Sequence, residues 1–186
     1  MKQVITDAVE ALRRGDTLMY PTDTIWGIGC DATVKEAVEK IYAVKMREAG
    51  RPLLVLANEG MLKADTPEVV KQMLRSERPT TVVMEARYLD TAVASNVPAE
   101  DGTVGVRVPR MEFCQQMLRE LGHPIVSTSA NLSGKPSPRC YDDIDPDLRE
   151  RIDVCVPDNK EYHHQEQPPS RIVRVWPDGK TEIIRE

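Results

Sequence analysis

The sequence predicts an α/β fold with some antiparallel strand pairing, and three observations indicate it. Apolar residues at helical spacing alternate along the chain with short strand-length runs rich in Val and Ile. The run 52–57 is almost continuously apolar, as in a strand whose two faces are both covered. The 186 residues show no internal repeat and no linker, so we expect a single domain over residues 1–186.

Three helices are expected in the first half of the chain. Apolar residues at helical spacing stop at Gly15 and predict a helix over 3–14. The sequence Thr33-Val-Lys-Glu36 has the form of a capping box and predicts the start of a second helix. Thr66-Pro67 predicts the N-cap and first residue of a third, and residues 21–31 are expected to form a loop. The strands expected in this half are 17–20, 52–57 and 80–84.

Strands and helices continue to alternate in the second half. The stretch 112–121 predicts a helix that Gly122 ends, and Asp145-Pro146 predicts the capped start of a short helix. The polar stretch 157–169 predicts a mobile surface loop. The strands expected here are 103–108, 124–128, 153–156 and a hairpin made of 171–176 and 180–185.

The charge balance and the aromatic content exclude some classes of function. The 25 basic and 30 acidic side chains give a net charge of -5, which argues against affinity for polyanions over the whole surface. Any anion binding must therefore be local. One Phe, two Trp and five Tyr are too few to predict the stacking platforms that bind single-stranded nucleic acid.

Cysteine and histidine usage predicts neither disulfides nor a metal site. The four cysteines form no C-x-x-C pair, as expected of reduced thiols in a cytoplasmic protein. The adjacent His163 and His164 have no ligand partner at helical spacing and favour a surface loop. The amino terminus lacks a signal-peptide core, and no stretch approaches the ~20 apolar residues that cross a bilayer.

Four cations stand out by their position. Lys45, Arg47 and Arg51 follow the second expected helix and would suit an anion, but cations at a helix carboxyl end also interact with its dipole and last carbonyl groups. Arg107 lies inside the otherwise apolar strand 103–108, where an unpaired charge is costly. Either an anionic ligand or a structural ion pair with an acidic residue would relieve that cost.

Two polar segments could bind a ligand or simply turn the chain. The segment 127–134 offers hydroxyl groups and an amide that suit a nucleotide or an amino acid, and the same residue types are common in turns. Gly27-Ile-Gly29-Cys-Asp-Ala32 formally matches the dinucleotide-binding pattern. Because 21–26 separates it from the preceding strand, a turn that requires glycine is at least as good an interpretation.

These segments, in their order and spacing, resemble the YrdC/TsaC family of threonylcarbamoyl-AMP synthases in its short, single-domain form. The resemblance spans nearly the whole chain. It implies a twisted, mixed α/β sheet of the YrdC-like type with flanking helices around an open basic cavity. It also implies a nucleotidyltransferase that joins L-threonine, bicarbonate and ATP into threonylcarbamoyl-adenylate, releases pyrophosphate and serves tRNA modification. The segments that carry it are Tyr20–Asp31, Lys45-x-Arg47, Val104–Val108, Val126–Gly134 and Pro169-Ser170.

The resemblance implies roles for individual side chains. On the threonine side these are Thr22, Arg107, Ser127 and Ser170. On the ATP side they are Lys45, Arg47, Arg51, Thr103, Ser129, Asn131, Ser137 and Arg185. Lys45 and Arg47 are expected to be the catalytic pair that holds the triphosphate. Mg²⁺ is implied with ATP as substrate, tRNA and the tRNA threonylcarbamoyl-transfer proteins are implied as partners, and no resident metal or membrane partner is expected.

The sequence departs from the family pattern at Arg171, and it leaves three alternative functions to consider. Arg171 stands beside Ser170 where a small residue is more familiar, and we expect it to narrow the cavity or to contact phosphate. The main alternative is a double-stranded RNA- or tRNA-binding protein of the YrdC fold without catalysis. A carbamoyl-transfer module like that of hydrogenase-maturation proteins would need zinc-binding cysteines, and a dinucleotide oxidoreductase would need differently placed glycines.

Overall fold

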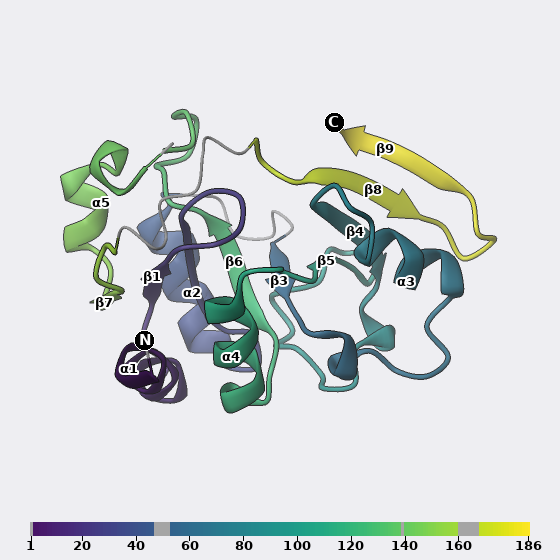
Figure 1. Cartoon of the computed structure of the whole chain (residues 1–186). Helices are drawn as coiled ribbons and strands as arrows, with labels where there is room; N and C mark the ends of the chain where they lie inside the picture. The colour runs from purple at the N-terminus through teal and green to yellow at the C-terminus, as the bar shows by residue number, and fades with distance from the viewer. Residues whose placement is uncertain (1, 47–52, 139, 160–167) are drawn as a thin grey trace.

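A mixed sheet of nine strands runs through the part of the chain that the computed structural model describes, residues 2–46, 53–138, 140–159 and 168–186 (Figure 1). The strand order is β7-β1-β2-β6-β3-β5-β4-β8-β9. The pairs β1–β7, β3–β5 and β4–β8 are parallel and the other neighbours are antiparallel, which confirms the predicted α/β fold. The strands are β1 (Leu18–Tyr20), β2 (Gly27–Asp31), β3 (Leu54–Leu56), β4 (Thr80–Glu85), β5 (Thr103–Arg107), β6 (Ile125–Ser129), β7 (Val154–Cys155), β8 (Arg171–Val175) and β9 (Thr181–Arg185).

Helices flank this sheet. The α-helices are α1 (Lys2–Arg13), α2 (Lys35–Val44), α3 (Glu68–Leu74), α4 (Glu112–Leu121) and α5 (Pro146–Glu150). Single 3-10 turns are η1 (Glu59–Met61), η2 (Ala86–Tyr88) and η3 (Tyr141–Asp143). Helix α1 packs on α4 and on β1, α2 packs on β2, and α3 packs on β4. Figure 1 shows α5 and β7 at one end of the sheet and the β8–β9 hairpin at the other.

The apolar residues at helical spacing become the main core. Ile5 and Leu12 of α1, Ile41 of α2, and Phe113 and Leu118 of α4 are all at most 1% exposed. Burial of each such side chain contributes roughly 1.5–3 kcal/mol. These helices therefore supply much of the apolar core that packs on the sheet.

The segment 27–31 corrects a prediction. It was expected to be loop, but it forms β2, whose five residues are all buried between β1 and β6. Glycines lower apparent strand propensity, yet here one of them is required by packing. A Cβ on Gly29 would lie 1.9 Å from the Val126 carbonyl oxygen, so only glycine lets β2 and β6 approach this closely. Neither Gly27 nor Gly29 has a positive φ, so the interpretation of these glycines as turn residues is wrong. The interpretation of 27–32 as a dinucleotide-binding loop is wrong too, because 27–31 is a strand.

Two of the predicted helix caps are also wrong. Helix α2 has Val34 as its N-cap without a side-chain hydrogen bond, and the Thr33 hydroxyl donates to Asp31 Oδ1 at 2.7 Å instead of accepting from a helix N–H. Helix α3 has Pro67 as its N-cap without a side-chain hydrogen bond. The helix ends predicted at Asp145 and Gly122 are confirmed: Asp145 accepts from the Asp147 N–H, and Gly122 adopts a left-handed φ of 81°.

Some sequence expectations fall on residues 47–52 and 160–167, which lie outside the described residues. They are the roles of Arg47 and Arg51, the adjacent His163 and His164, and most of the expected loop 157–169. Within the described ranges, no helix is long and apolar enough to cross a bilayer. The four cysteines are free.

Candidate functional site

A cavity of about 900 Å³ lies over one face of the central strands. Side chains alternate across a strand, so Thr103, Gly105 and Arg107 of β5 all face it. Gly27 and Gly105 contribute no side chain to its floor, which leaves room for a ligand. The lining also includes Thr22, Thr24, Thr81, Asp101, Ser127, Ser129, Ser137, Ser170, Ile172, Arg174 and Arg185. This volume lies at the upper end of the range for small-molecule sites, ~300–1,000 Å³.

The residues that line the cavity fall into two groups that differ in exposure and are called the buried end and the exposed end. The buried end consists of polar side chains that are at most 8% exposed: Thr22, Thr24, Thr81, Arg107, Ser127 and Ser170. The exposed end consists of partly or largely exposed residues from β5, β8, β9 and the neighbouring loops: Asp101, Thr103, Ser137, Arg174 and Arg185.

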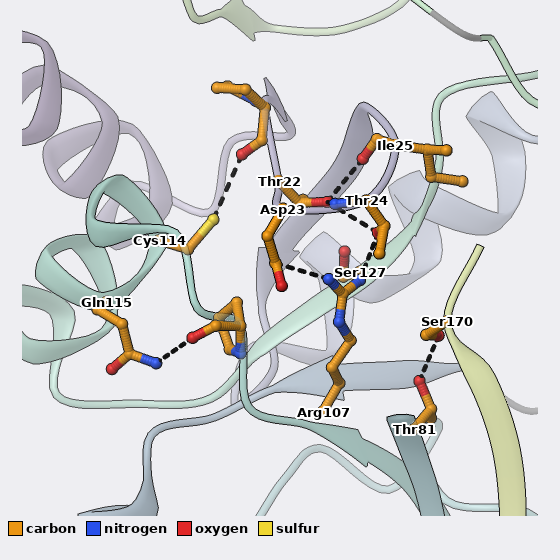
Figure 2. Close-up of polar contacts among 12 residues, drawn as sticks. Thr22, Asp23, Thr24, Ile25, Thr81, Arg107, Cys114, Gln115, Ser127 and Ser170 are labelled. Carbon is orange, nitrogen blue, oxygen red and sulfur yellow. Dashed lines mark hydrogen bonds and ion pairs between the residues drawn. The ribbon is translucent and has the colours of Figure 1, made fainter. Parts of the chain in front are cut away.

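Arg107 is the charged centre of the buried end (Figure 2). Its Nη2 lies 2.6 Å from Asp23 Oδ1, and its Nη1 donates to Thr24 Oγ1 at 2.6 Å. The Arg107 and Asp23 side chains are only 7% and 15% exposed. The structural ion pair considered for Arg107 is therefore present, and it neutralises the guanidinium charge inside the cavity.

The two threonines of the loop before β2 have no hydroxyl proton to spare. Thr22 Oγ1 donates to the Ile25 carbonyl at 2.7 Å and accepts from the Thr24 N–H. Its single proton is thus used, so Thr24 must be the donor in the 3.1 Å bond between the two hydroxyls. Thr22 was predicted to contact threonine, and it does line the cavity, but its hydroxyl proton and both of its lone pairs are already used within this loop.

Ser127 presents a different pattern. Its Oγ accepts a 2.8 Å hydrogen bond from the hydroxyl of Tyr20, a side chain with no exposed surface. Burial raises the pKa of Tyr20 far above its usual range, so this phenol stays a donor at every working pH. Opposite, on β4 and at the start of β8, Thr81 Oγ1 and Ser170 Oγ lie 2.8 Å apart (Figure 2). One of these two must donate to the other.

The exposed end contains an ion pair and an arginine of another kind. Asp101 accepts from the Thr103 hydroxyl at 2.6 Å and pairs with Arg174 at 2.5 Å, and these contacts lower the pKa of Asp101 to about 2. Arg185 donates to the Ser170 carbonyl at 2.7 Å but has no carboxylate partner among the described residues. Partial burial lowers its pKa. Among the described residues, Arg185 is thus the lining cation without a carboxylate partner.

Lys45 does not line the cavity in the described structure but holds a residue that does. It ends α2, and its ammonium, only 4% exposed, donates to the Ser129 carbonyl at 2.7 Å and to Asn131 Oδ1 at 3.0 Å. The Asn131 carbonyl accepts from it too. Asn131 Oδ1 also accepts from the Ser129 hydroxyl. The three residues therefore form one hydrogen-bonded network at the exit of β6.

The structure brings together most of the side chains that the sequence pointed to. Thr22, Arg107, Ser127 and Ser170 gather at the buried end, and Thr103, Ser129, Ser137 and Arg185 line the same cavity. Lys45 and Asn131 lie next to it through Ser129. The expectation for Arg171 is wrong. Strand alternation turns Ser170, Ile172 and Arg174 toward the cavity and Arg171 away from it, so the additional cation comes from Arg174, three residues later.

Sequence reasoning missed several members of the site. Asp23 and Thr24 lie in the polar segment that was singled out, but nothing in the sequence pairs them with Arg107, 83 and 84 residues away. Thr81 could have been found, because it alternates with Val83 along β4 and so shares a face with it. The partner of Ser127, Tyr20, has no signal beyond its place in the same segment.

The fold and the cavity define an α/β protein whose open sheet carries a polar, arginine-containing site of small-molecule size. The chain belongs to the Sua5/YciO/YrdC family, because the family model described as "Telomere recombination" matches residues 10–186. This confirms the resemblance drawn from the sequence motifs.

Three relatives illustrate the similarity. The threonylcarbamoyl-AMP synthase of Bacillus subtilis (strain 168) is 35% identical over 80% of this chain and 44% of its own length. The threonylcarbamoyl-AMP synthase of Xylella fastidiosa (strain M23) is 31% identical over 77% of this chain and 80% of its own. The crystal structure of P. abyssi Sua5 complexed with L-threonine superposes with a TM-score of 0.81 at 26% identity, over 97% of this chain and 53% of that one. The chain thus spans about half the length of two of these relatives.

Proposed function

We propose that this chain is a threonylcarbamoyl-AMP synthase, which joins L-threonine, bicarbonate and ATP and releases pyrophosphate. The observation that carries the proposal is one cavity whose lining combines buried hydroxyl groups with an exposed arginine that has no carboxylate partner among the described residues. The first suits a small amino acid and the second suits a phosphate chain. Relatives named for this activity, at 31% and 35% identity, support it.

The buried end is where we place L-threonine. Arg107 and its hydroxyl neighbours offer directional donors and acceptors in a space of low exposure, and the related P. abyssi protein is described in complex with L-threonine. The threonine amine would face the exposed end, since it must react there with bicarbonate-derived carbon dioxide and then with the nucleotide.

The exposed end is where we place ATP. The amine takes up carbon dioxide as a carbamate and loses a proton; a carbamate oxygen then attacks the α-phosphorus, and the bond to the β-phosphate oxygen breaks to release pyrophosphate. Negative charge grows on the phosphate oxygens, where Arg185 and the hydroxyl groups of Ser129 and Ser137 can meet it. Positioning and electrostatics are enough for this chemistry, and no side-chain nucleophile is required.

Mg²⁺ belongs to this proposal as part of the ATP substrate. Within the described ranges no cluster of three or more His, Cys, Asp or Glu is placed to hold a metal ion, and Asp101 in the lining is already paired with Arg174. Mg²⁺ commonly binds through substrate phosphates with one or two carboxylates, and it would supply charge neutralisation on the triphosphate. Transfer of the product to tRNA by partner proteins, and a cytoplasmic location, remain predictions.

The direct test is incubation of the purified chain with ATP, Mg²⁺, L-threonine and bicarbonate, followed by detection of pyrophosphate and of the adenylate. Pyrophosphate release that requires both threonine and bicarbonate supports the proposal. Salt-dependent tRNA binding without ATP turnover would replace it with the RNA-binding alternative.

Lys45 provides the sharper variant. Lys45→Ala removes the donor that ties the Ser129 carbonyl to Asn131, so we expect activity to fall at least ~100-fold, with a stability loss of about 1–3 kcal/mol from unsatisfied acceptors. Lys40→Ala is the matched control, because Lys40 also lies on α2 but makes only partly exposed contacts far from the cavity lining. Near-normal threonine-dependent pyrophosphate release in Lys45→Ala and Arg47→Ala would contradict the roles proposed for this pair.

A further inference from the structure

The hydroxyl groups at the buried end of the cavity differ in whether their proton is still available to a ligand. A hydroxyl group has one proton to donate, so a group whose proton is already used can only accept from a ligand. Thr22 donates to the Ile25 carbonyl, and Thr24 then donates to Thr22. Thr81 and Ser170 spend one proton on their mutual bond.

Ser127 differs because its hydroxyl accepts a hydrogen bond from Tyr20 and keeps its own proton. The Tyr20 hydroxyl donates to Ser127 Oγ, so one lone pair of the serine is occupied while its own proton has no acceptor among the described residues. Ser127 is 6% exposed and lines the same cavity as Arg107. The serine proton can therefore be satisfied by an acceptor that enters the cavity.

The charge balance nearby makes this donor important. Asp23 already neutralises Arg107, so an anion in the buried end gains less from net charge than from correctly aimed donors. In the proposed reaction the amine of threonine is consumed but its carboxylate is not. That carboxylate is the acceptor that persists from substrate to product.

We propose that Tyr20 is a positioning residue that fixes the Ser127 hydroxyl as a donor into the cavity, where it binds the carboxylate of the amino-acid substrate. The proposal rests on the proposed function, since it takes L-threonine as the ligand. Tyr20 itself touches no ligand: it is fully buried and acts through the orientation of the serine hydroxyl.

The test measures binding of L-threonine and of L-threoninol, which lacks the carboxylate, by calorimetry. Tyr20→Phe removes only the hydroxyl, and we expect the affinity for threonine to fall about 3–10-fold, the range expected for one misdirected hydrogen bond. Ser127→Ala should lose about tenfold, and Tyr20→Phe combined with Ser127→Ala should bind no worse than Ser127→Ala alone. Binding of L-threoninol should change little in any of these variants.

Steady-state kinetics separates positioning from a general structural effect. In Tyr20→Phe we expect the KM for threonine to rise with the affinity loss, while kcat stays within about twofold and the KM for ATP is unchanged. Tyr42→Phe is the matched control, because Tyr42 is also buried and its hydroxyl donates to the Asn96 carbonyl outside the cavity lining. That variant should bind threonine like the wild type.

Each outcome decides between the two proposals. If the wild type binds threonine and Tyr20→Phe binds it equally well, the role of Tyr20 is wrong while the proposed function stands. If Tyr20→Phe and Tyr42→Phe weaken threonine and threoninol alike, the effect is structural and the role of Tyr20 is again wrong. If the folded wild type binds no threonine, the proposed function fails and the role of Tyr20 fails with it.

Discussion

The two ends of the cavity contain arginines in opposite states. Arg107 at the buried end is 6% exposed and already has a carboxylate and a hydroxyl as partners, whereas Arg185 at the exposed end bonds, among the described residues, only the Ser170 carbonyl. A buried cation without a partner would destabilise the fold, so the chain supplies Asp23. An exposed cation is solvated before the ligand arrives and needs no such partner. The same residue type therefore maintains structure at one end and remains available for a ligand at the other.

The largest effect should come from breaking the buried pair. Arg107→Ala leaves the Asp23 carboxylate, 15% exposed, without its counter-charge, and we expect a loss of roughly 3–5 kcal/mol in the free energy of unfolding. Urea unfolding followed by circular dichroism measures it. Threonine-dependent pyrophosphate release should disappear as well.

A double variant shows whether the pair itself is responsible. Arg107→Ala with Asp23→Ala removes both charges and should recover much of the lost stability without recovering activity. If Arg107→Ala is as stable as the wild type, the ion pair between Arg107 and Asp23 does not stabilise the fold, and the proposed difference between Arg107 and Arg185 is wrong.

An intermediate effect is expected at the exposed end. Arg185→Ala removes a cation without leaving a carboxylate unpaired, so stability should change by less than about 1 kcal/mol. The KM for ATP should rise about tenfold while the KM for threonine stays the same, because a lost charged hydrogen bond to phosphate is a ground-state contact. Arg119→Ala is a suitable control, because Arg119 lies on α4 and is not among the residues that line the cavity. An unchanged KM for ATP would remove Arg185 from the proposed ATP site.

The smallest effect should come from Asp101. Its pKa is lowered to about 2 by Thr103 and Arg174, so its stabilising contribution is present above the unfolded-state pKa near 3.9 and is lost as the pH falls through about 2. Because the side chain is 47% exposed, Asp101→Asn should cost at most ~1 kcal/mol at neutral pH. Urea titrations from pH 6 downward should show the two proteins converging below pH 4; a constant difference would contradict the pairing.

The sequence correctly predicts the helices and strands whose bounds are determined by their own residues. Helix α4 follows from its apolar spacing and from Gly122, which ends it in the left-handed conformation. The segment 27–31 was assigned wrongly because the need for its glycine comes from the neighbouring strand. A Cβ on Gly29 would clash with the Val126 carbonyl oxygen, and the residues of β2 alone do not indicate that contact. The cap predicted at Thr33 is wrong because the N-cap lies one residue later, at Val34, while the N–H and the hydroxyl of Thr33 both donate to Asp31 Oδ1.

The site shows the same division. Arg107 could be singled out because a charge within an apolar strand is anomalous on its own, and an ion pair was one of two explanations already considered. Its partner Asp23 could not be chosen from 30 acidic residues without the three-dimensional arrangement. Arg171 was given a role in the cavity from its proximity to Ser170 in sequence, but strand alternation gives the role to Arg174.

The strand order has a further consequence, for the time course of folding. The cavity floor is assembled from β2, β6, β3, β5, β4 and β8, and except for β4 and β5 the strands that are neighbours in this order are not consecutive along the chain. Pairings over such separations close large loops and form slowly. A partly folded chain can hold α1 or α2 but has no place for a substrate. Substrate therefore binds only after folding is complete, and saturating L-threonine should prolong the resistance of the native protein to heat and proteolysis.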